Sequence, residues 1–290
     1  MTALFALATS LLWGLADFGG GLLTRRTPAL TVVVVSQTLA VVVLGAVVVA
    51  TGGWTEAGPR LWFAVAAGVL GPVAMLAFYK ALALGPMGVV SPLASLGVVV
   101  PVSVGLATGG GPGPVQLAGV AVAVAGVVLA GGPELRGAPV QRRTVLLTLV
   151  AAFGFGGVMA LIAEASTTLT GLFLALFVQR VTNVAVGGTA LWLSVRRGGR
   201  ALPEGAGSLR ALRGSLPALA FVGLADVAAN GTYAIAAQSG PVALAAVLAS
   251  LYPVVTALAA RGVLKERLRA VQAAGAGLAL AGSVLLATAG

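Results

Sequence analysis

The sequence contains neither cysteine nor histidine. Without cysteine the chain has no disulfide, no thiol nucleophile and no sulfur ligand for a metal, and its redox compartment cannot be inferred. Without histidine it lacks the commonest metal ligand and the commonest general base near neutral pH. We therefore expect a protein that is not an enzyme and that needs no metal or other cofactor.

Charge is also scarce. Charged residues make up 8% of the 290 residues, whereas hydrophobic residues make up 59%, and the mean hydropathy is +1.08. A soluble protein carries about 25% charged residues, because its surface must be solvated by water. The composition excludes soluble globular, disordered and coiled-coil proteins and leaves the polytopic membrane class.

Long apolar runs dominate what is present. A helix that crosses a bilayer needs about 20 mostly apolar residues. The first run has no basic n-region and contains Asp17, so we interpret it as a retained helix and not as a signal peptide. Cutting the chain at charge clusters and at Gly/Pro breaks predicts ten transmembrane helices: Leu4–Leu23, Leu30–Ala50, Leu61–Leu84, Met87–Ala107, Val115–Ala130, Val145–Ala165, Leu172–Val195, Leu216–Ala237, Val242–Ala260 and Val271–Ala287.

The two halves of the chain repeat each other. The segment Leu93–Leu96 (LASL) recurs as Leu248–Leu251 at a shift of 155 residues, and Val115–Gly119 recurs in part as Val271–Gly275 at a shift of 156. Each half holds five predicted helices, an odd number, so the second half enters the membrane in the opposite sense. We predict an all-α polytopic membrane protein of ten transmembrane helices, built as two inverted five-helix repeats at residues 1–132 and 144–290, with a linker at 133–143 and a cavity between the repeats.

Several motifs resemble one transporter family. The segment Leu248–Thr256 looks like that family's ninth helix, Leu264–Leu268 (LKERL) looks like the loop after it, and Leu12-Trp13-Gly14 is similar to its first-helix signature. On these motifs the chain resembles the EamA-type ten-helix members of the drug/metabolite transporter superfamily. Two features depart from the pattern: Arg180 matches the arginine of the seventh helix, but the second helix has Gln37-Thr38, and Gly109–Pro112 replaces the first basic loop.

The resemblance covers essentially the whole chain and implies a transporter fold. It does not imply a substrate, because relatives are assigned to amino acids, nucleotide sugars, drugs and other metabolites.

Basic residues predict the orientation in the membrane. Of the 17 lysines and arginines, 15 lie in the loops or helix ends after odd-numbered helices, whereas Arg60 lies on the opposite side and Arg180 within a helix. Basic loops stay in the cytoplasm. The sequence therefore predicts a multi-pass protein of the cytoplasmic membrane with both termini outside, although many relatives have both termini inside. Basic residues confined to loops do not predict nucleic-acid binding.

Asp226 is the most central charge in the predicted membrane region. Asn230 and Tyr233 follow it at helical spacing, so the three side chains share one face of the eighth helix. A charge at this depth needs a partner, a cavity or a neutralised form. The functional interpretation is a cavity wall that contacts substrate or a coupling proton, and the alternative is a polar network that holds helices together.

The seventh and first helices supply further candidates. Arg180, with Gln179 and Asn183, either pairs with a carboxylate such as Asp226 or binds an anionic substrate group, and a structural arginine is the alternative. Asp17 lies one turn after Trp13 and is either a gate or proton site or a solvated helix-end acid. Glu164 we assign to solvent.

Prolines predict broken helices at a binding site. Ser91-Pro92 and Pro101 interrupt the fourth predicted helix, and Pro253 interrupts the ninth. Ser95 and Ser250 occupy matched positions beside these prolines, and Tyr252, like Trp13, is an aromatic candidate for the cavity wall, with core or lipid packing as the alternative.

These observations predict a secondary active transporter of a small metabolite, amino acid or drug-like compound, and we expect an exporter coupled to protons. The partners are then a small-molecule substrate, the lipid bilayer and protons. A passive facilitator or channel is the alternative, and a membrane scaffold is a less favoured one. An intramembrane enzyme is disfavoured because the chain lacks an activated nucleophile. No phosphate-binding glycine loop with its lysine is present to drive pumping by ATP.

Overall fold

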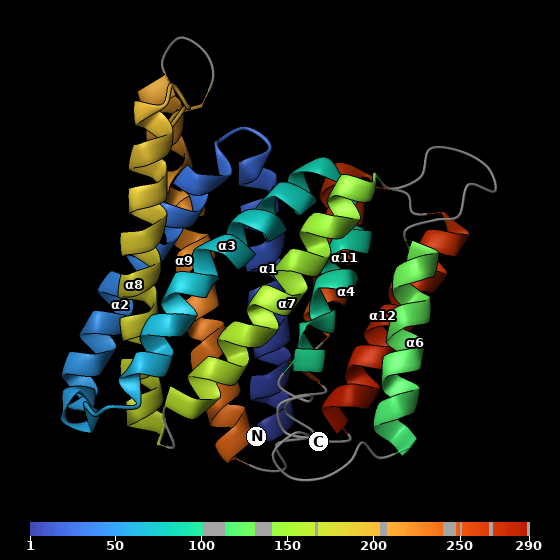
Figure 1. Ribbon diagram of the computed structural model, residues 1–290, viewed down its shortest axis with the longest axis horizontal. Helices are drawn as coiled ribbons and strands as arrows, with labels where there is room; N and C mark the ends of the chain where they lie inside the picture. Colours follow the sequence, from blue (N-terminus) through green and yellow to red (C-terminus); the bar gives the residue numbers. More distant parts are fainter. Residues whose placement is uncertain are drawn as a thin grey trace.

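The computed structural model describes residues 1–100, 114–130, 141–165, 168–203, 208–239, 248–249, 251–266 and 269–288. All regular structure in these residues is helical (Figure 1), and six helices are long and apolar enough to cross a membrane. These six are α1 (Thr2–Thr24), α2 (Ala29–Thr51), α3 (Leu61–Leu84), α7 (Arg142–Ala165), α8 (Leu169–Arg196) and α9 (Ser208–Gln238). Shorter helices are η1 (Gly53–Glu56), α4 (Met87–Ala94), η2 (Ser95–Val98), α6 (Pro114–Ala130), α11 (Tyr252–Leu264) and α12 (Ala270–Thr288).

Most predicted helices are present with small shifts of their ends. The largest extension is at α9, which begins at Ser208 and not at Leu216, so that Arg210 and Arg213 lie on its exposed first turns. The prediction stopped at these charges because it searched for hydrocarbon-spanning residues, whereas backbone hydrogen bonds continue a helix into water. At α8 the side chain of Thr168 accepts a hydrogen bond from the Gly171 amide and caps the helix.

The fourth and ninth helices differ from the prediction. Pro92 lies inside α4 and does not interrupt it, and the chain tightens into the 3₁₀ helix η2 only at Ser95, whose hydroxyl donates to the Pro92 carbonyl at 2.7 Å. Pro253 lies in the first turn of α11, where its missing amide costs little, and not in a helix interior. Pro101 and residues 240–247 lie outside the described residues, so the count of ten spans remains a prediction.

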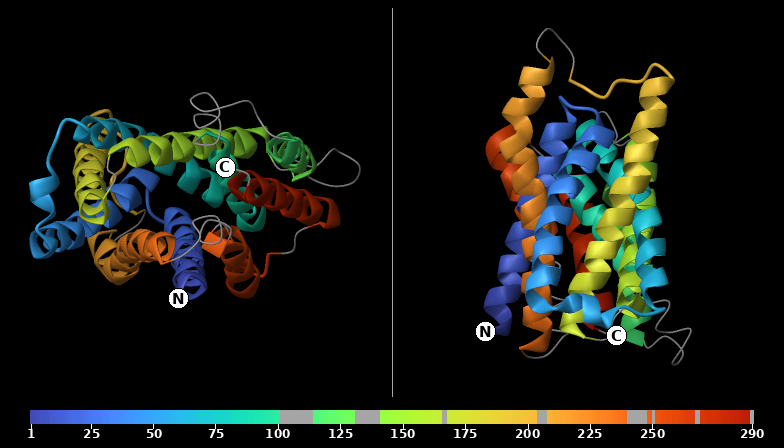
Figure 2. Two further views of the ribbon diagram at one scale, coloured as in Figure 1. Left: turned by 90° about the horizontal axis from the view of Figure 1, so that it is seen from below. Right: turned by 90° about the vertical axis from the view of Figure 1, so that its left-hand side faces the viewer.

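The bundle has two sides. Seen along the helices, α3 and α7 lie along one side and α9, α1 and α11 along the other (Figure 2). The most extensive packing joins α6 to α12, α3 to α7, α1 to α9 and α2 to α8, followed by α3 to α8 and α2 to α9. All eight residues of α4 are buried, and this helix contacts α7, α11 and α12 in the centre.

The packing pairs are exchanged between the two halves. We match the helices of the two halves in order, so that α1, α2 and α3 correspond to α7, α8 and α9. The contact of α1 with α9 then corresponds to that of α7 with α3, and the contact of α2 with α9 corresponds to that of α8 with α3. The pairs α2 with α8 and α6 with α12 each map onto themselves. All six of the most extensive pairings join one half of the chain to the other, and all six follow this one rule.

Individual close contacts follow the same exchange. Gly68 of α3 lies against the backbone carbonyl of Gln179 on α8, and Gly223 of α9, 155 residues later, lies against the carbonyl of Ser36 on α2. Glycine is required at these points because a Cβ atom would overlap backbone atoms of the neighbouring helix. The two halves therefore approach each other through corresponding small residues.

The ends of the bundle differ in charge. α1 begins and α12 ends at one end, and the basic connection after α1, the end of α8 and the start of α9 lie at the other end (Figure 1). Arg25 in the first of these connections pairs with Glu266 at 3.2 Å, and the other carboxylate oxygen of Glu266 accepts from the Gly88 amide at the start of α4.

Candidate functional site

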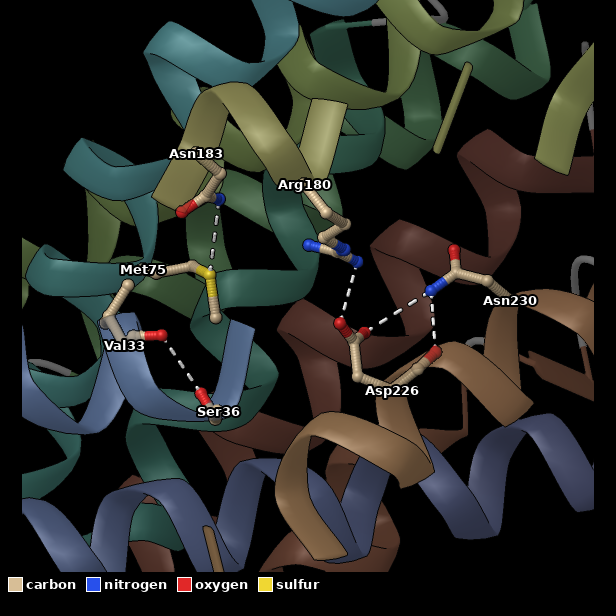
Figure 3. Close-up of polar contacts among 7 residues, drawn as sticks. All are labelled: Val33, Ser36, Met75, Arg180, Asn183, Asp226 and Asn230. Carbon is tan, nitrogen blue, oxygen red and sulfur yellow. Dashed lines mark hydrogen bonds and ion pairs between the residues drawn. The ribbon is translucent and has the colours of Figure 1, made fainter. Parts of the chain in front are cut away.

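A buried ion pair lies between the seventh and eighth predicted membrane helices, α8 and α9. The Arg180 guanidinium donates to the Asp226 carboxylate with Nη2–Oδ2 at 2.7 Å, and the two side chains are 11% and 20% exposed (Figure 3). The sequence predicted both residues and named this pairing as one alternative. Because both charges lie in apolar surroundings, each removes most of the cost of burying the other.

Asn230 extends the pair along α9, as its helical spacing predicts. Its amide nitrogen donates to the Asp226 carbonyl at 2.7 Å and to the Asp226 carboxylate oxygen Oδ1 at 3.3 Å (Figure 3). The carboxylate therefore has one partner on each oxygen. The hydrogen bonding of Arg180 is less complete, because its Nε atom is buried without a hydrogen-bond partner among the described residues.

Buried amides surround the arginine side of the pair. Asn183 donates weakly to the sulfur of Met75 on α3 at 3.8 Å (Figure 3), whereas its oxygen and that of Gln179 have no partner in the described part of the chain. Both side chains are at most 2% exposed, and both reach over Gly71 of α3. The two amides occupy the space that a side chain at position 71 of α3 would need.

Gln37 is a buried polar residue that the predicted site did not include. It is 1% exposed on α2, and neither its amide nitrogen nor its amide oxygen has a hydrogen-bond partner in the region described. A signal for it existed in the sequence, because Gln37 stands where the first half replaces the arginine that the second half carries as Arg180.

Asp17 lies close to this pair but outside it. The carboxylate is within electrostatic range of Asp226, and Tyr79 of α3 is within range of Asp17, Asp226 and Arg180. No hydrogen bond or ion pair is present between Asp17 and any other residue of the described segments. The structure thus brings two acids and one base together inside the bundle.

The predicted aromatic residues form one cluster. The Trp13 ring lies 6.0 Å from that of Tyr233 and 6.1 Å, edge to face, from that of Tyr252. Tyr252 is also within electrostatic range of Asp17. Rings from α1, α9 and α11 therefore meet one turn along α1 from the carboxylate.

The remaining predicted residues lie elsewhere. Ser95 is buried at the start of η2 and donates to the Pro92 carbonyl of α4, and Ser250 lies outside the described residues. Glu164 is exposed at the end of α7, in agreement with its assignment to solvent.

Comparison with known proteins gives a similar fold and a family for the chain. A solved structure titled "Crystal structure of protein" has a TM-score of 0.56 and 17% identity, covering 98% of this chain and 96% of its own, and it shows a similar fold. No curated protein matches the sequence. The family model for the EamA-like transporter family matches residues 1–132 and again residues 142–288. Two successive matches together cover nearly the whole chain, and several helices are long and apolar enough to span a membrane, so this multi-pass membrane protein belongs to the EamA-like transporter family of the drug/metabolite transporter superfamily.

Proposed function

We propose that the protein is a secondary active transporter that exports a small metabolite, amino acid or drug-like compound across the cytoplasmic membrane in exchange for protons. Its transport pathway runs between two inverted five-helix repeats, residues 1–132 and 144–290, joined by the linker 133–143. The exchange of packing pairs between the halves supports this arrangement. Transporters built in this way alternate access by rocking one repeat against the other around a fixed central site.

Matched contacts at other places in the bundle support the repeats. Gly14 of α1 lies against Tyr252 and Val255 of α11, and Gly156 of α7 lies against Gly97 and Val100. Tyr252 and Val255 follow Gly97 and Val100 by the same 155 residues that separate the two LASL segments. A pseudo-twofold axis between the halves accounts for both contacts at once.

The observation that carries the proposal is the charge cluster of Asp17, Arg180 and Asp226. When all three groups are ionised, two acids and one base leave one negative charge uncompensated inside the bundle. Because such a charge is costly in a membrane, it must be neutralised by a proton or by a substrate group. Competition between the two for the same cluster exchanges one for the other, which is the elementary requirement of proton-coupled export.

The cluster also has to change as the pathway opens. Arg180 and Asp226 come from neighbouring helices of the second half, while Asp17 and Tyr79 come from the first. A movement of one half against the other therefore alters the distance between the acids without breaking a backbone hydrogen bond. The resulting change in repulsion links the position of the halves to the number of bound protons.

The test compares wild type with Asp226→Asn in proteoliposomes. The radiolabelled compound is first selected by thermal shift from amino acids, nucleosides and quaternary amines, since binding to the folded state raises its stability. Asp226→Asn keeps the shape and removes one acid, so Arg180 then compensates Asp17. We expect equilibrating exchange to continue and accumulation driven by a pH gradient to disappear.

Three outcomes are informative. Accumulation by Asp226→Asn at the wild-type rate contradicts proton coupling through this cluster. Accumulation absent even in wild type, with exchange intact, favours a passive facilitator. Failure of the variant to fold assigns the Arg180–Asp226 pair a structural role.

A further inference from the structure

Asp17 takes no part in the ion pair of Arg180 with Asp226, and aromatic residues of several helices lie near it. Gly14 and Gly20 lie one turn to either side of Asp17 on the same side of α1. At Gly14 the backbone of Tyr252 presses against α1, and at Gly20 the ring and hydroxyl of Tyr79 do so. The Asp17 carboxylate is thus flanked by two tyrosines from other helices.

Among the residues that the structure describes, none supplies a cation that pairs with the Asp17 carboxylate. The groups that face it from the neighbouring helices are Tyr79 on α3, Asp226 on α9 and Tyr252 on α11. Asp226 is an acid that repels Asp17, and Arg180 is already held by Asp226 at 2.7 Å. Lys80 is exposed near the end of α3. In the described part of the chain, Asp17 therefore attracts a positive charge that the protein does not supply.

The rings beside it add a second attraction for a cation. The centre of the Trp13 ring lies 6.0 Å from that of Tyr233 and 6.1 Å from that of Tyr252, and all three side chains are only partly buried. The face of an aromatic ring attracts a cation within about 6 Å, and clusters of rings recognise ammonium and quaternary ammonium groups. A metal ion is disfavoured, because one carboxylate is too few hard ligands to replace its water.

We propose that Asp17 and the rings of Trp13, Tyr233 and Tyr252 bind an ammonium or quaternary ammonium group of the transported compound. The inference rests on the proposed transport function and narrows its substrate to organic cations, including amphipathic amines whose apolar parts pack on the rings. The bound ammonium group supplies the positive charge that the cluster lacks. Protons and the organic cation then compete for Asp17.

Binding is measured by isothermal titration calorimetry on the full chain in detergent, so that the result does not depend on transport. The probe is choline, and its control is 3,3-dimethylbutan-1-ol, which has the same shape without the charge. We expect choline to bind at least tenfold more tightly than the alcohol. Asp17→Asn should weaken choline binding at least tenfold, whereas Glu164→Gln, which removes an exposed carboxylate elsewhere, should leave it unchanged.

The aromatic contribution is tested separately, in case Asp17→Asn does not fold. Tyr233→Leu should weaken choline binding at least threefold, and Tyr233→Phe, which keeps the ring and removes the hydroxyl, should bind as wild type does. The proposal is overturned if wild type does not bind choline, if the neutral alcohol binds equally well, or if Asp17→Asn or Tyr233→Leu binds like wild type. Choline binding without flux in proteoliposomes would contradict the transport function and leave this site intact.

Discussion

Single residues inside the bundle carry most of the chemistry in this protein. The sequence predicted Asp226, Asn230 and Arg180 because a charged or amide side chain stands out in an apolar run, and helical spacing places Asn230 beside Asp226. The pairing of Arg180 with Asp226 was one alternative among several, since a sequence does not give the rotation of one helix about another. Gln37 was missed because an uncharged amide stands out less than a charge in a valine-rich run, and its position is marked only by comparison with Arg180 in the second half.

The ion pair gives a prediction about stability. Arg180→Gln leaves Asp226 as an unpaired buried acid, and breaking a buried pair in this way costs about 3 kcal/mol or more in the free energy of unfolding. The double variant Arg180→Gln/Asp226→Asn removes both charges and should recover more than half of that loss. Denaturant unfolding in detergent measures both. Equal stability of Arg180→Gln and wild type would show that the pair is not formed in the folded protein.

Elements meet in this fold through small residues. The positions of α1, α2, α3 and α7 followed from hydropathy alone, because a bilayer requires long apolar helices. The 3₁₀ segment η2 did not follow from hydropathy, and in the structure its Gly97 packs closely against the Ala152 carbonyl of α7. Hydropathy reports how deep a residue lies but not which neighbour it touches.

The close packing of α7 against η2 predicts that a methyl group added at this contact destabilises the protein, whereas one added at an open position does not. Gly156→Ala places a Cβ atom onto the Gly97 carbonyl and Val100, and overpacking of this kind costs about 1–3 kcal/mol. Gly188→Ala on α8 is the matched control, because its Cβ meets no atom within 4 Å and alanine favours a helix. The melting temperature in detergent should fall for the first variant and hold or rise for the second. A fall of equal size in both would contradict the close approach of α7 and η2.

At the scale of the whole molecule, the inverted arrangement was predicted from an odd number of helices per repeat. The paired LASL segments and the two family matches agree with duplication, and the packing pairs are exchanged between the two halves. Which helices pack together could not be read from the sequence, because all of them are apolar on most of their surface. Orientation in the membrane depends on the charge at the two ends of the bundle. Neither the helix packing nor the family determines this orientation.

Orientation is tested with single cysteines in this naturally cysteine-free chain. Leu209→Cys lies on the exposed first turn of α9 at the basic end, and Thr55→Cys lies in the exposed segment η1 at the other. The positive-inside rule predicts that an impermeant thiol reagent added to intact cells labels Thr55→Cys alone. Labelling of Leu209→Cys with protection of Thr55→Cys would reverse the assignment and place both termini inside.

The central claim is that a central cluster with one uncompensated acid exchanges protons for substrate. The most direct measurement is the pH inside proteoliposomes that contain a trapped pH-sensitive dye, after the transported compound is added outside. If the protein exchanges the compound for protons, uptake must carry protons out, and the lumen becomes alkaline in wild type but not in Asp226→Asn. Uptake of the compound by wild type with no change in lumen pH would contradict the account.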